Sequence, residues 1–195
     1  MKKILIYSLF YFIFVGILIV CLISTGDGLT EKTIKITKHS LSVDVFNWSV
    51  YQLNSYGKYL GGYKAFNIIL FAVLWPSLIL YFMILSFYFF QRKERTFYQP
   101  KLFWGMSAFY FVLVFVLMGI FLADKTSHTE LKLSQENTFF YQCCNLVISI
   151  AKMTNFTYES LNVAVFVVLQ PALILYFSSA ALYLFRVSKA SETKT

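Results

Sequence analysis

The chain has 195 residues and a net charge of +8, with 58% hydrophobic, 20% aromatic and only 13% charged residues. So few charged side chains cannot cover a water-soluble globule of this size, which excludes an ordinary soluble domain and indicates a protein of the lipid bilayer. The positive charge does not require a nucleic-acid partner, because lysines and arginines at the ends of membrane helices meet anionic lipid.

Four apolar stretches are long enough to cross a membrane, at residues 4–23, 66–90, 102–123 and 161–185. A helix rises about 1.5 Å per residue, so about twenty residues cross about 30 Å of hydrocarbon. We therefore expect an all-α integral membrane protein with four transmembrane helices. The first stretch is expected to be a span and not a cleaved signal peptide, because no small-x-small cleavage site follows it.

Lysine and arginine are concentrated in three short segments, namely the N-terminus, the 91–101 connection and the tail after Phe185. These segments carry nine of the 17 basic residues, whereas the much longer segments 24–65 and 124–160 carry the other eight, together with seven of the nine acids. By the positive-inside rule, both termini and the 91–101 connection are cytoplasmic. The two longer segments then face outward, and in a Gram-negative bacterium the sequence predicts a multi-pass protein of the inner membrane with these segments in the periplasm.

Two apolar segments are nearly identical, FAVLWPSLILYF at 71–82 and FVVLQPALILYF at 166–177, and the likeness extends to Asn67 and Asn162. We interpret them as two parallel tandem repeats, each consisting of a helix out, an exterior segment and a helix back. The alternative is a chance likeness between apolar helices that draw on few residue types. The predicted organisation is a first repeat at 1–93, a cytoplasmic connection at 94–101, a second repeat at 102–186 and a cytoplasmic tail at 187–195.

Each of the two segments holds a proline, Pro76 or Pro171, inside a predicted span. A proline in a helix removes one backbone hydrogen bond and kinks the helix, which neighbouring helices in a membrane accommodate. One interpretation is that the two kinks only improve packing. The other is that Pro76 and Pro171 are helix hinges, through which the cytoplasmic halves of both helices move together.

The two exterior segments share a plan of a short strand followed by a helix. Alternating apolar and polar residues predict strands at 33–37 and 129–134, and helical spacing follows at 43–60 and 139–153. Since neither segment can bury its apolar side alone, we expect the two to build a small α/β exterior cap jointly. Cys143 and Cys144 are adjacent, so a disulfide between them is unfavourable, although a bridge between two chains stays open.

The sequence holds no recognisable catalytic or metal-binding pattern. His39 and His128 are isolated, and no phosphate loop, nucleophile motif or metal-ligand spacing occurs. We expect neither an enzyme nor a bound cofactor or metal. Because the four predicted spans contain no ionisable residue, ion-coupled transport is also weakly supported, and a pore with a hydrophobic gate stays open.

With its length, four spans, cytoplasmic termini and two exterior segments, the chain resembles the membrane-subunit (KwaA) family of the Kiwa anti-phage defence system. The resemblance implies a homo-oligomeric membrane assembly that responds to phage at the envelope and anchors a cytoplasmic effector protein related to KwaB. Under this hypothesis the residues that dock the effector are Arg92, Lys93, Arg95 and Lys101. The alternative is that these four residues only anchor the helix ends in the membrane.

Two other classes of function stay open. Immunity proteins against pore-forming bacteriocins are also small, basic and multi-span, and they act through lipid-facing residues. An oligomeric channel or transporter component is the third reading. A neighbouring effector gene favours defence, a bacteriocin gene favours immunity, and conductance in a planar bilayer favours a channel.

Overall fold

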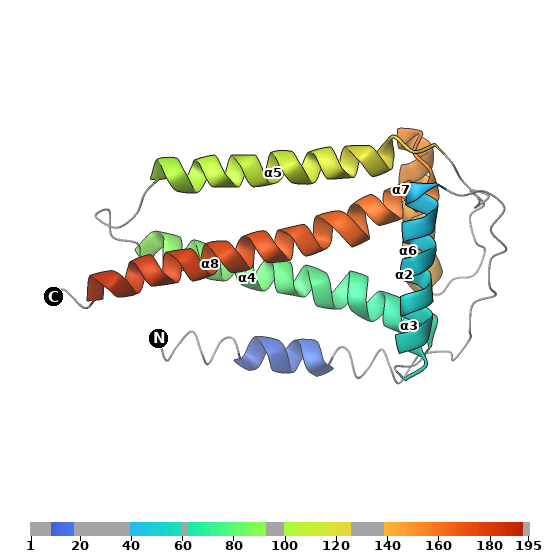
Figure 1. The fold of residues 1–195 in the computed structure, drawn as a ribbon. Coiled ribbons are helices and arrows are strands. Elements are labelled where there is room, and N and C mark those ends of the chain that lie inside the picture. The colour runs from blue at the N-terminus through green and yellow to red at the C-terminus, as the bar shows by residue number, and fades with distance from the viewer. Residues whose placement is uncertain (1–8, 18–39, 60–61, 93–99, 126–138, 193–195) are drawn as a thin grey trace. The chain divides into compact units, whose positions relative to one another are not determined.

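The computed structural model describes residues 9–17, 40–59, 62–92, 100–125 and 139–192. Every regular element within these ranges is a helix, as Figure 1 shows. Residues 9–17 are helical, whereas the rest of the predicted first span lies outside the described residues. The chain divides into two compact units, and each is considered by itself.

The second unit, residues 75–120 and 164–195, contains most of three long helices. They are α4 (Trp75–Arg92), α5 (Pro100–Leu122) and α8 (Gln170–Glu192). Leucine and phenylalanine are the commonest residues of these helices, and Pro100 occupies the first position of α5, where its missing N–H costs no helical hydrogen bond. The helices are thus apolar around most of their circumference, as lipid-embedded helices are.

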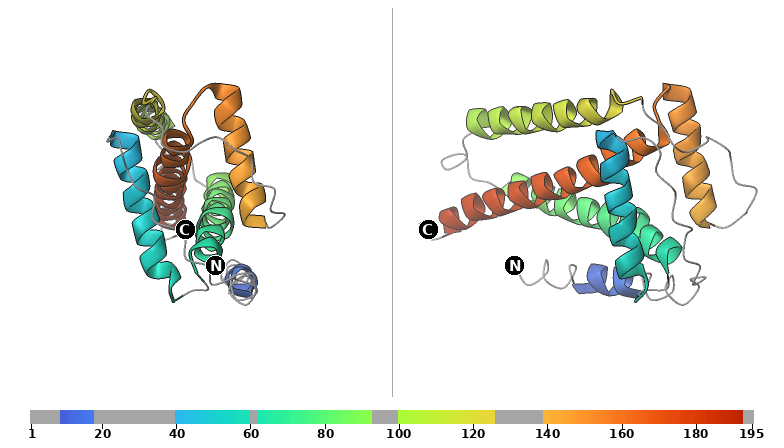
Figure 2. Two further views of the ribbon diagram at one scale, coloured as in Figure 1. Left: turned by 90° about the vertical axis from the view of Figure 1, so that its right-hand side faces the viewer. Right: turned by 45° about the vertical axis from the view of Figure 1, so that its right-hand side comes forward.

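Helices α4 and α8 lie side by side and run in the same direction (Figures 1 and 2). The Ser86 hydroxyl of α4 lies 2.9 Å from the carbonyl oxygen of Phe177 of α8. Further along both helices, Phe89 packs edge-on against Phe185 with 5.2 Å between ring centroids. Because the later residue of α4 contacts the later residue of α8, the two helices are parallel.

Helix α5 packs antiparallel to α8. Near its start, Phe103 stacks on Tyr183 with 5.7 Å between ring centroids. Later in α5, the Tyr110 hydroxyl donates a hydrogen bond to the carbonyl oxygen of Ala172 at 2.7 Å. Tyrosine thus supplies both apolar ring contact and a polar link between two helices that have no hydrophobic driving force for association in lipid.

Besides the helical residues 9–17, the described part of the first unit, which covers residues 1–74 and 121–163, contains five helical elements. They are α2 (Leu41–Gly57), α3 (Tyr63–Asn67), the π-helix η1 (Ile68–Leu74), α6 (Phe139–Thr154) and α7 (Tyr158–Asn162). Its core joins Leu53 of α2, Tyr63 of α3 and Phe140 of α6. Helix α2 begins after Ser40, whose hydroxyl accepts a hydrogen bond from the amide of Val43 and so caps the helix.

A π-helical segment of seven residues precedes each of the two repeated prolines. Segment η1 ends two residues before Pro76, and η2 (Val163–Leu169) ends two residues before Pro171. A proline ring clashes with the carbonyl four residues earlier, and the wider π-turn is one of the local adjustments by which membrane helices accommodate it. Elements α7, η2 and α8 each begin 95 residues after α3, η1 and α4.

Among the described residues, three helices are long and apolar enough to cross a membrane. They cover Tyr63–Gln91 with 29 residues, Pro100–Leu122 with 23 and Tyr158–Lys189 with 32. The prediction of apolar membrane helices is confirmed for these three, which coincide with the predicted spans at 66–90, 102–123 and 161–185. The fourth span, both parallel repeats and the organisation of the chain into two halves stay predictions.

The exterior segments are described only in part. The helix expected at 139–153 is α6, and α2 covers most of the helical stretch at 43–60. Both predicted strands, at 33–37 and 129–134, lie outside the described residues, as do His39 and His128. The part of the chain that the structure describes contains helices and no strand, so the α/β character of the cap also stays a prediction.

Replacing Leu184 by Ala is expected to destabilise the second unit. Leu184 is 1% exposed, whereas Leu182 on the same helix is 61% exposed. Lipid tails are as apolar as leucine, so the loss is mainly of packing, on the order of 2 kcal/mol, the low end for buried leucines. Thermal unfolding in detergent should show a lower Tm for Leu184→Ala and little change for Leu182→Ala. Equal shifts in both variants would contradict the packing of α8.

Candidate functional site

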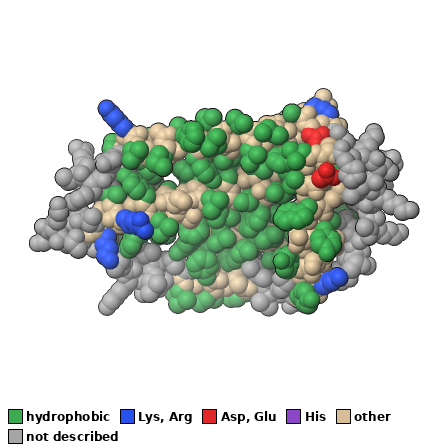
Figure 3. Space-filling model, viewed as in Figure 1, with side chains coloured by type: hydrophobic (Ala, Val, Ile, Leu, Met, Phe, Trp, Pro, Cys, Tyr) green, Lys and Arg blue, Asp and Glu red, His purple; other side chains and the backbone are tan. Residues whose placement is uncertain are grey.

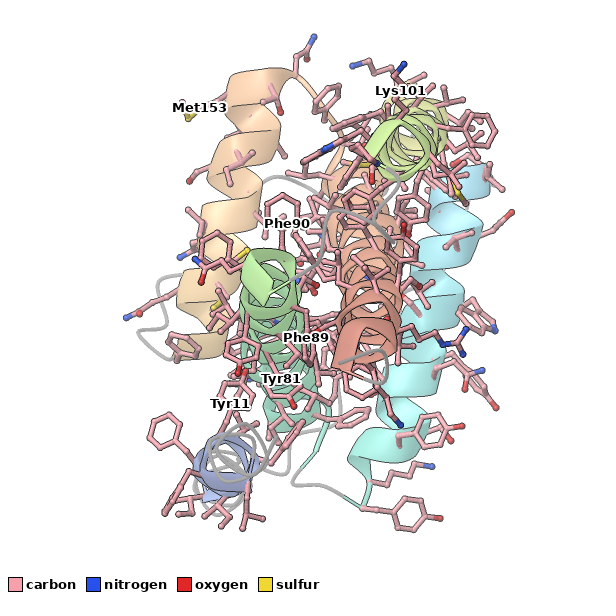
Figure 4. All side chains as sticks on the ribbon, turned by 90° about the vertical axis from the view of Figure 1, so that its left-hand side faces the viewer. Tyr11, Tyr81, Phe89, Phe90, Lys101 and Met153 are labelled. Carbon is pink, nitrogen blue, oxygen red and sulfur yellow. The ribbon has the colours of Figure 1, made fainter. Side chains whose placement is uncertain are left out.

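The four residues predicted to dock a partner surround the connection between α4 and α5. Arg92 is the last residue of α4, and Lys101 is exposed in the first turn of α5, where Figure 4 labels it. Lys93 and Arg95 lie outside the described residues. The structure therefore places two of the four residues at helix ends and leaves their joint role a prediction.

Helix α8 adds two basic residues at the same end of the second unit. Arg186 and Lys189 are both exposed near the end of α8. The stacking of Phe103 on Tyr183 holds the first turn of α5 beside this part of α8, which brings Lys101 to the same end. We call Lys101, Arg186 and Lys189 the basic end. Figure 3 shows basic side chains at the ends of these helices and apolar side chains over the stretch between.

Pro76 and Pro171 occupy the same position in their helices, the second residue of α4 and of α8, and both are half-buried. The carbonyl that accepts from Tyr110 belongs to Ala172, the residue directly after Pro171. Helix α5 thus holds α8 at the turn that contains the proline. A fixed contact at this turn is compatible with both roles considered for the prolines, packing and hinge.

Helix α6 connects the first turns of two membrane helices. At its beginning, the Phe140 ring packs on Tyr63 of α3, and the Tyr141 ring lies under the Lys64 ammonium, 4.5 Å from the ring centroid. At its end, a three-residue turn leads into α7, and Asn155 in this turn has a φ of 56°. Since α3 and α7 begin the helices Tyr63–Gln91 and Tyr158–Lys189, α6 lies at the depth where both helices start.

Helix α2 makes the complementary connection. Its end leads into α3, and Tyr56 packs on Phe66 with 6.4 Å between ring centroids. Near its beginning, Phe46 packs edge-on against Tyr158, the first residue of α7, at 5.8 Å. We call α2 and α6 the bracket helices, because each one contacts the first turns of both membrane helices.

A polar cluster lies where the start of α2 meets the end of α5. The Ser42 hydroxyl donates to the carbonyl oxygen of Phe121 at 3.1 Å, and the Ser42 amide donates to the Asp124 carboxylate at 3.1 Å. The Lys125 ammonium donates to the carbonyl oxygen of Asn155 at 2.6 Å. A backbone carbonyl at the end of α5 and a backbone amide at the start of α2, which lack partners within their own helices, are thereby bonded to side chains. These bonds connect the end of α5 to α2.

Glu159 is the one carboxylate among the buried residues that the structure describes, at 1% exposure. It lies in the first turn of α7, whose start is capped by the Thr157 hydroxyl accepting from the Ser160 amide at 3.1 Å. The positive end of the helix dipole favours a carboxylate at this position. Burying a carboxyl group is costly without such stabilisation, so the packing of Glu159 depends on the local structure at the start of α7.

Among the residues that the structure describes, no group of three histidine, cysteine, aspartate or glutamate side chains is placed to hold a metal ion. Neither Cys143 nor Cys144 is in a disulfide with another described residue, and the Tyr158 hydroxyl lies 3.9 Å from the Cys144 sulfur. Burial raises the pKa of the Cys143 thiol, which keeps it protonated at neutral pH and makes it a weak nucleophile. The chemistry of this region is thus hydrogen bonding and packing.

Sequence reasoning missed the polar cluster and Glu159. Asp124 directly follows the third apolar stretch, and Thr157 precedes a charged first turn, which is a typical helix start. These signals indicate where helices end and begin. The partners of Ser42 lie 79 and 82 residues away in the chain, and no local pattern predicts such contacts.

Replacing Ser42 by Ala is expected to loosen the start of α2. Ser42 is fully buried, and its loss leaves the Phe121 carbonyl without this donor, at a cost of about 1–3 kcal/mol. Amide hydrogen exchange in lipid nanodiscs should accelerate in the first turns of α2 and at 121–125. Ser49→Ala is the matched control on α2, because the Ser49 hydroxyl bonds only locally to the Phe46 carbonyl at 2.6 Å. Similar exchange in the two variants would refute the role of the cluster.

Comparisons with protein-family models, with curated proteins and with solved structures find no match for this chain. A function for the chain is therefore inferred from three structural features. They are the basic end, the two π-helices that each precede a proline, and the bracket helices with their buried polar cluster.

Proposed function

We propose that the chain is an inner-membrane scaffold and sensor that responds to phage at the envelope and anchors a cytoplasmic effector protein. The observation that supports this proposal is a single helix, Tyr158–Lys189, which begins in the bracket and ends in the basic end. A change at the bracket acts directly on the first turn of this helix. The basic end offers Arg186 and Lys189 to an acidic partner surface, for which charge complementarity provides specificity.

The proposed topology has four spans, both termini in the cytoplasm and two parallel tandem repeats. The common direction of α4 and α8 supports it, because helices in equivalent positions of parallel repeats cross the membrane the same way. The 95-residue offset of three successive elements, including both π-helices, supports a duplication better than chance likeness does, since π-helices are rare. Under this topology the basic end is cytoplasmic and the bracket is exterior.

A second candidate function rests on α5. This helix exposes large apolar side chains along its whole length, among them Met106, Phe109 and Phe115, each more than 60% exposed. Such a surface suits other copies of the chain in a homo-oligomer, as the Kiwa resemblance implies. It equally suits the hydrophobic helices of a pore-forming toxin, as in a bacteriocin immunity protein. Protection of cells against a bacteriocin, without any effect on phage, would favour that second candidate.

The double variant Arg92→Glu with Arg95→Glu is expected to lose its cytoplasmic partner while it still inserts into the membrane. Reversing two positive charges in the connection turns attraction to an acidic surface into repulsion. Affinity purification in mild detergent, followed by mass spectrometry, measures the co-purified protein. The matched control is Lys58→Glu with Lys152→Glu, which makes the same charge change at two exposed residues of the exterior segments. Undiminished co-purification in the first variant would discard the docking proposal.

The double variant Pro76→Ala with Pro171→Ala is expected to straighten two helices and to impair protection against phage at normal expression. Alanine restores a backbone N–H and removes the clash that favours the π-turn. The third proline gives the control, because Pro100 is the first residue of α5 and Pro100→Ala should leave protection unchanged. Phage plating efficiency measures the effect. Full protection by the double variant would assign both prolines to packing alone.

A further inference from the structure

Helix α6 has three distinct faces. Phe140, Cys144, Ile148 and Ala151 face the first unit, and three of them, all except Cys144, are buried. A second face, spaced by seven, four and three residues, carries the exposed apolar side chains Phe139, Leu146, Ile150 and Met153. The third face is polar and carries Gln142, Asn145, Ser149 and Lys152.

These faces occupy different parts of the circumference of α6. At 100° per residue, the centre of the exposed apolar face lies about 145° from that of the buried face and about 90° from that of the polar face. A helix that lies between protein and water needs only two faces, one apolar and one polar. The third, exposed apolar face requires a third environment. We call this face, made by Phe139, Leu146, Ile150 and Met153, the outer stripe.

The position of α6 indicates what that environment is. Three residues separate Thr154 from Tyr158, so the end of α6 lies within about 14 Å of the start of a membrane helix. The beginning of α6 is held by the packing of Phe140 on Tyr63, the first residue of another such helix. Both ends of this helix, about 24 Å long, are therefore held at the depth where two membrane helices begin.

We propose that α6 lies on the line where protein, lipid and water meet, with the outer stripe inserted into the leaflet in which the two membrane helices begin. The two membrane helices themselves expose apolar side chains, among them Ile84, Leu175 and Leu182. Met153, at 86% exposure, projects outward from α6 (Figure 4). Lys152 is the only charged residue of α6 and lies on the polar face, from which a lysine reaches lipid phosphates.

This inference depends on the membrane placement that the proposed function also requires, but not on defence or on any effector. It gives the bracket a direct contact with lipid. Because α6 also packs on α7, a change in lipid packing at the outer stripe reaches the start of the helix Tyr158–Lys189 without a protein ligand. The partner that this surface fits is thus the bilayer itself.

Site-directed spin labelling tests the proposal. In a chain carrying Cys21→Ser, Cys143→Ser and Cys144→Ser, single cysteines are introduced as Leu146→Cys on the outer stripe, Lys152→Cys on the polar face and Ile148→Cys on the buried face. The labelled proteins are placed in vesicles of phosphatidylethanolamine and phosphatidylglycerol. Accessibility to oxygen reports lipid, and accessibility to a water-soluble nickel chelate reports water.

The label at 146 is expected to favour oxygen, the label at 152 to favour nickel, and the label at 148 to be shielded from both. Met153→Cys repeats the outer-stripe measurement at a position whose exposure leaves little packing to lose. Nickel accessibility at 146 and 153 would overturn the proposal in favour of water. Low accessibility to both reagents there would overturn it in favour of a second copy or another protein. A label from Phe115→Cys on α5 separately reports membrane placement, so the two failures are distinguishable.

Discussion

Every backbone N–H and C=O inside hydrocarbon needs a partner within the protein, and this constraint governs the rest of the structure. Helices satisfy it except at a proline, where one N–H is missing and a carbonyl is displaced. The chain has a proline at the second residue of both α4 and α8 and a π-helix before each. Tyr110 then adds a donor at the turn of Pro171, on the carbonyl of Ala172. This bond holds α5 to α8 beside Pro171, whereas the carbonyl displaced by the proline ring lies about four residues earlier in the helix.

The same constraint explains the bracket helices. A membrane helix ends with unpaired backbone groups, and at the end of α5 the Phe121 carbonyl accepts from Ser42 of α2. Helix α2 precedes α3 in the chain but packs on α7, through Phe46 and Tyr158. Helix α6 precedes α7 but packs on α3, through Phe140 and Tyr63. Helix α2 therefore contacts the membrane helix that follows α6, and α6 contacts the membrane helix that follows α2. Neither part of the first unit, residues 1–74 or residues 121–163, makes these contacts alone.

The parts of this fold that could be predicted are those that depend on local sequence patterns. Twenty or more apolar residues predict a membrane helix, and the spacing at 139–153 predicts α6, which the structure confirms. The π-helices were not predicted, because they depend on how neighbouring helices support a proline. The burial of Glu159 and the bonds of Ser42 were missed for the same reason, since their surroundings come from distant parts of the chain. The distribution of lysine and arginine along the chain identified the candidate docking residues. It does not distinguish residues that anchor a helix end in the membrane from residues that bind a partner protein.

The polar links within the second unit limit which motions its prolines allow. Beyond the prolines, α4 and α8 are joined by Ser86 at the Phe177 carbonyl and by Phe89 on Phe185. Bending one helix alone beyond its proline would separate Ser86 from the Phe177 carbonyl and Phe89 from Phe185, although the Ser86 hydroxyl also bonds within α4, to the Phe82 carbonyl at 2.7 Å. Helix α5 contacts α8 through Tyr110 and again through Ser107, which accepts from the Tyr176 hydroxyl at 2.9 Å. If Pro76 and Pro171 act as hinges, these contacts favour a shift of α4 and α8 as a pair against α5, which the hydrogen bonds of Tyr110 and Tyr176 oppose.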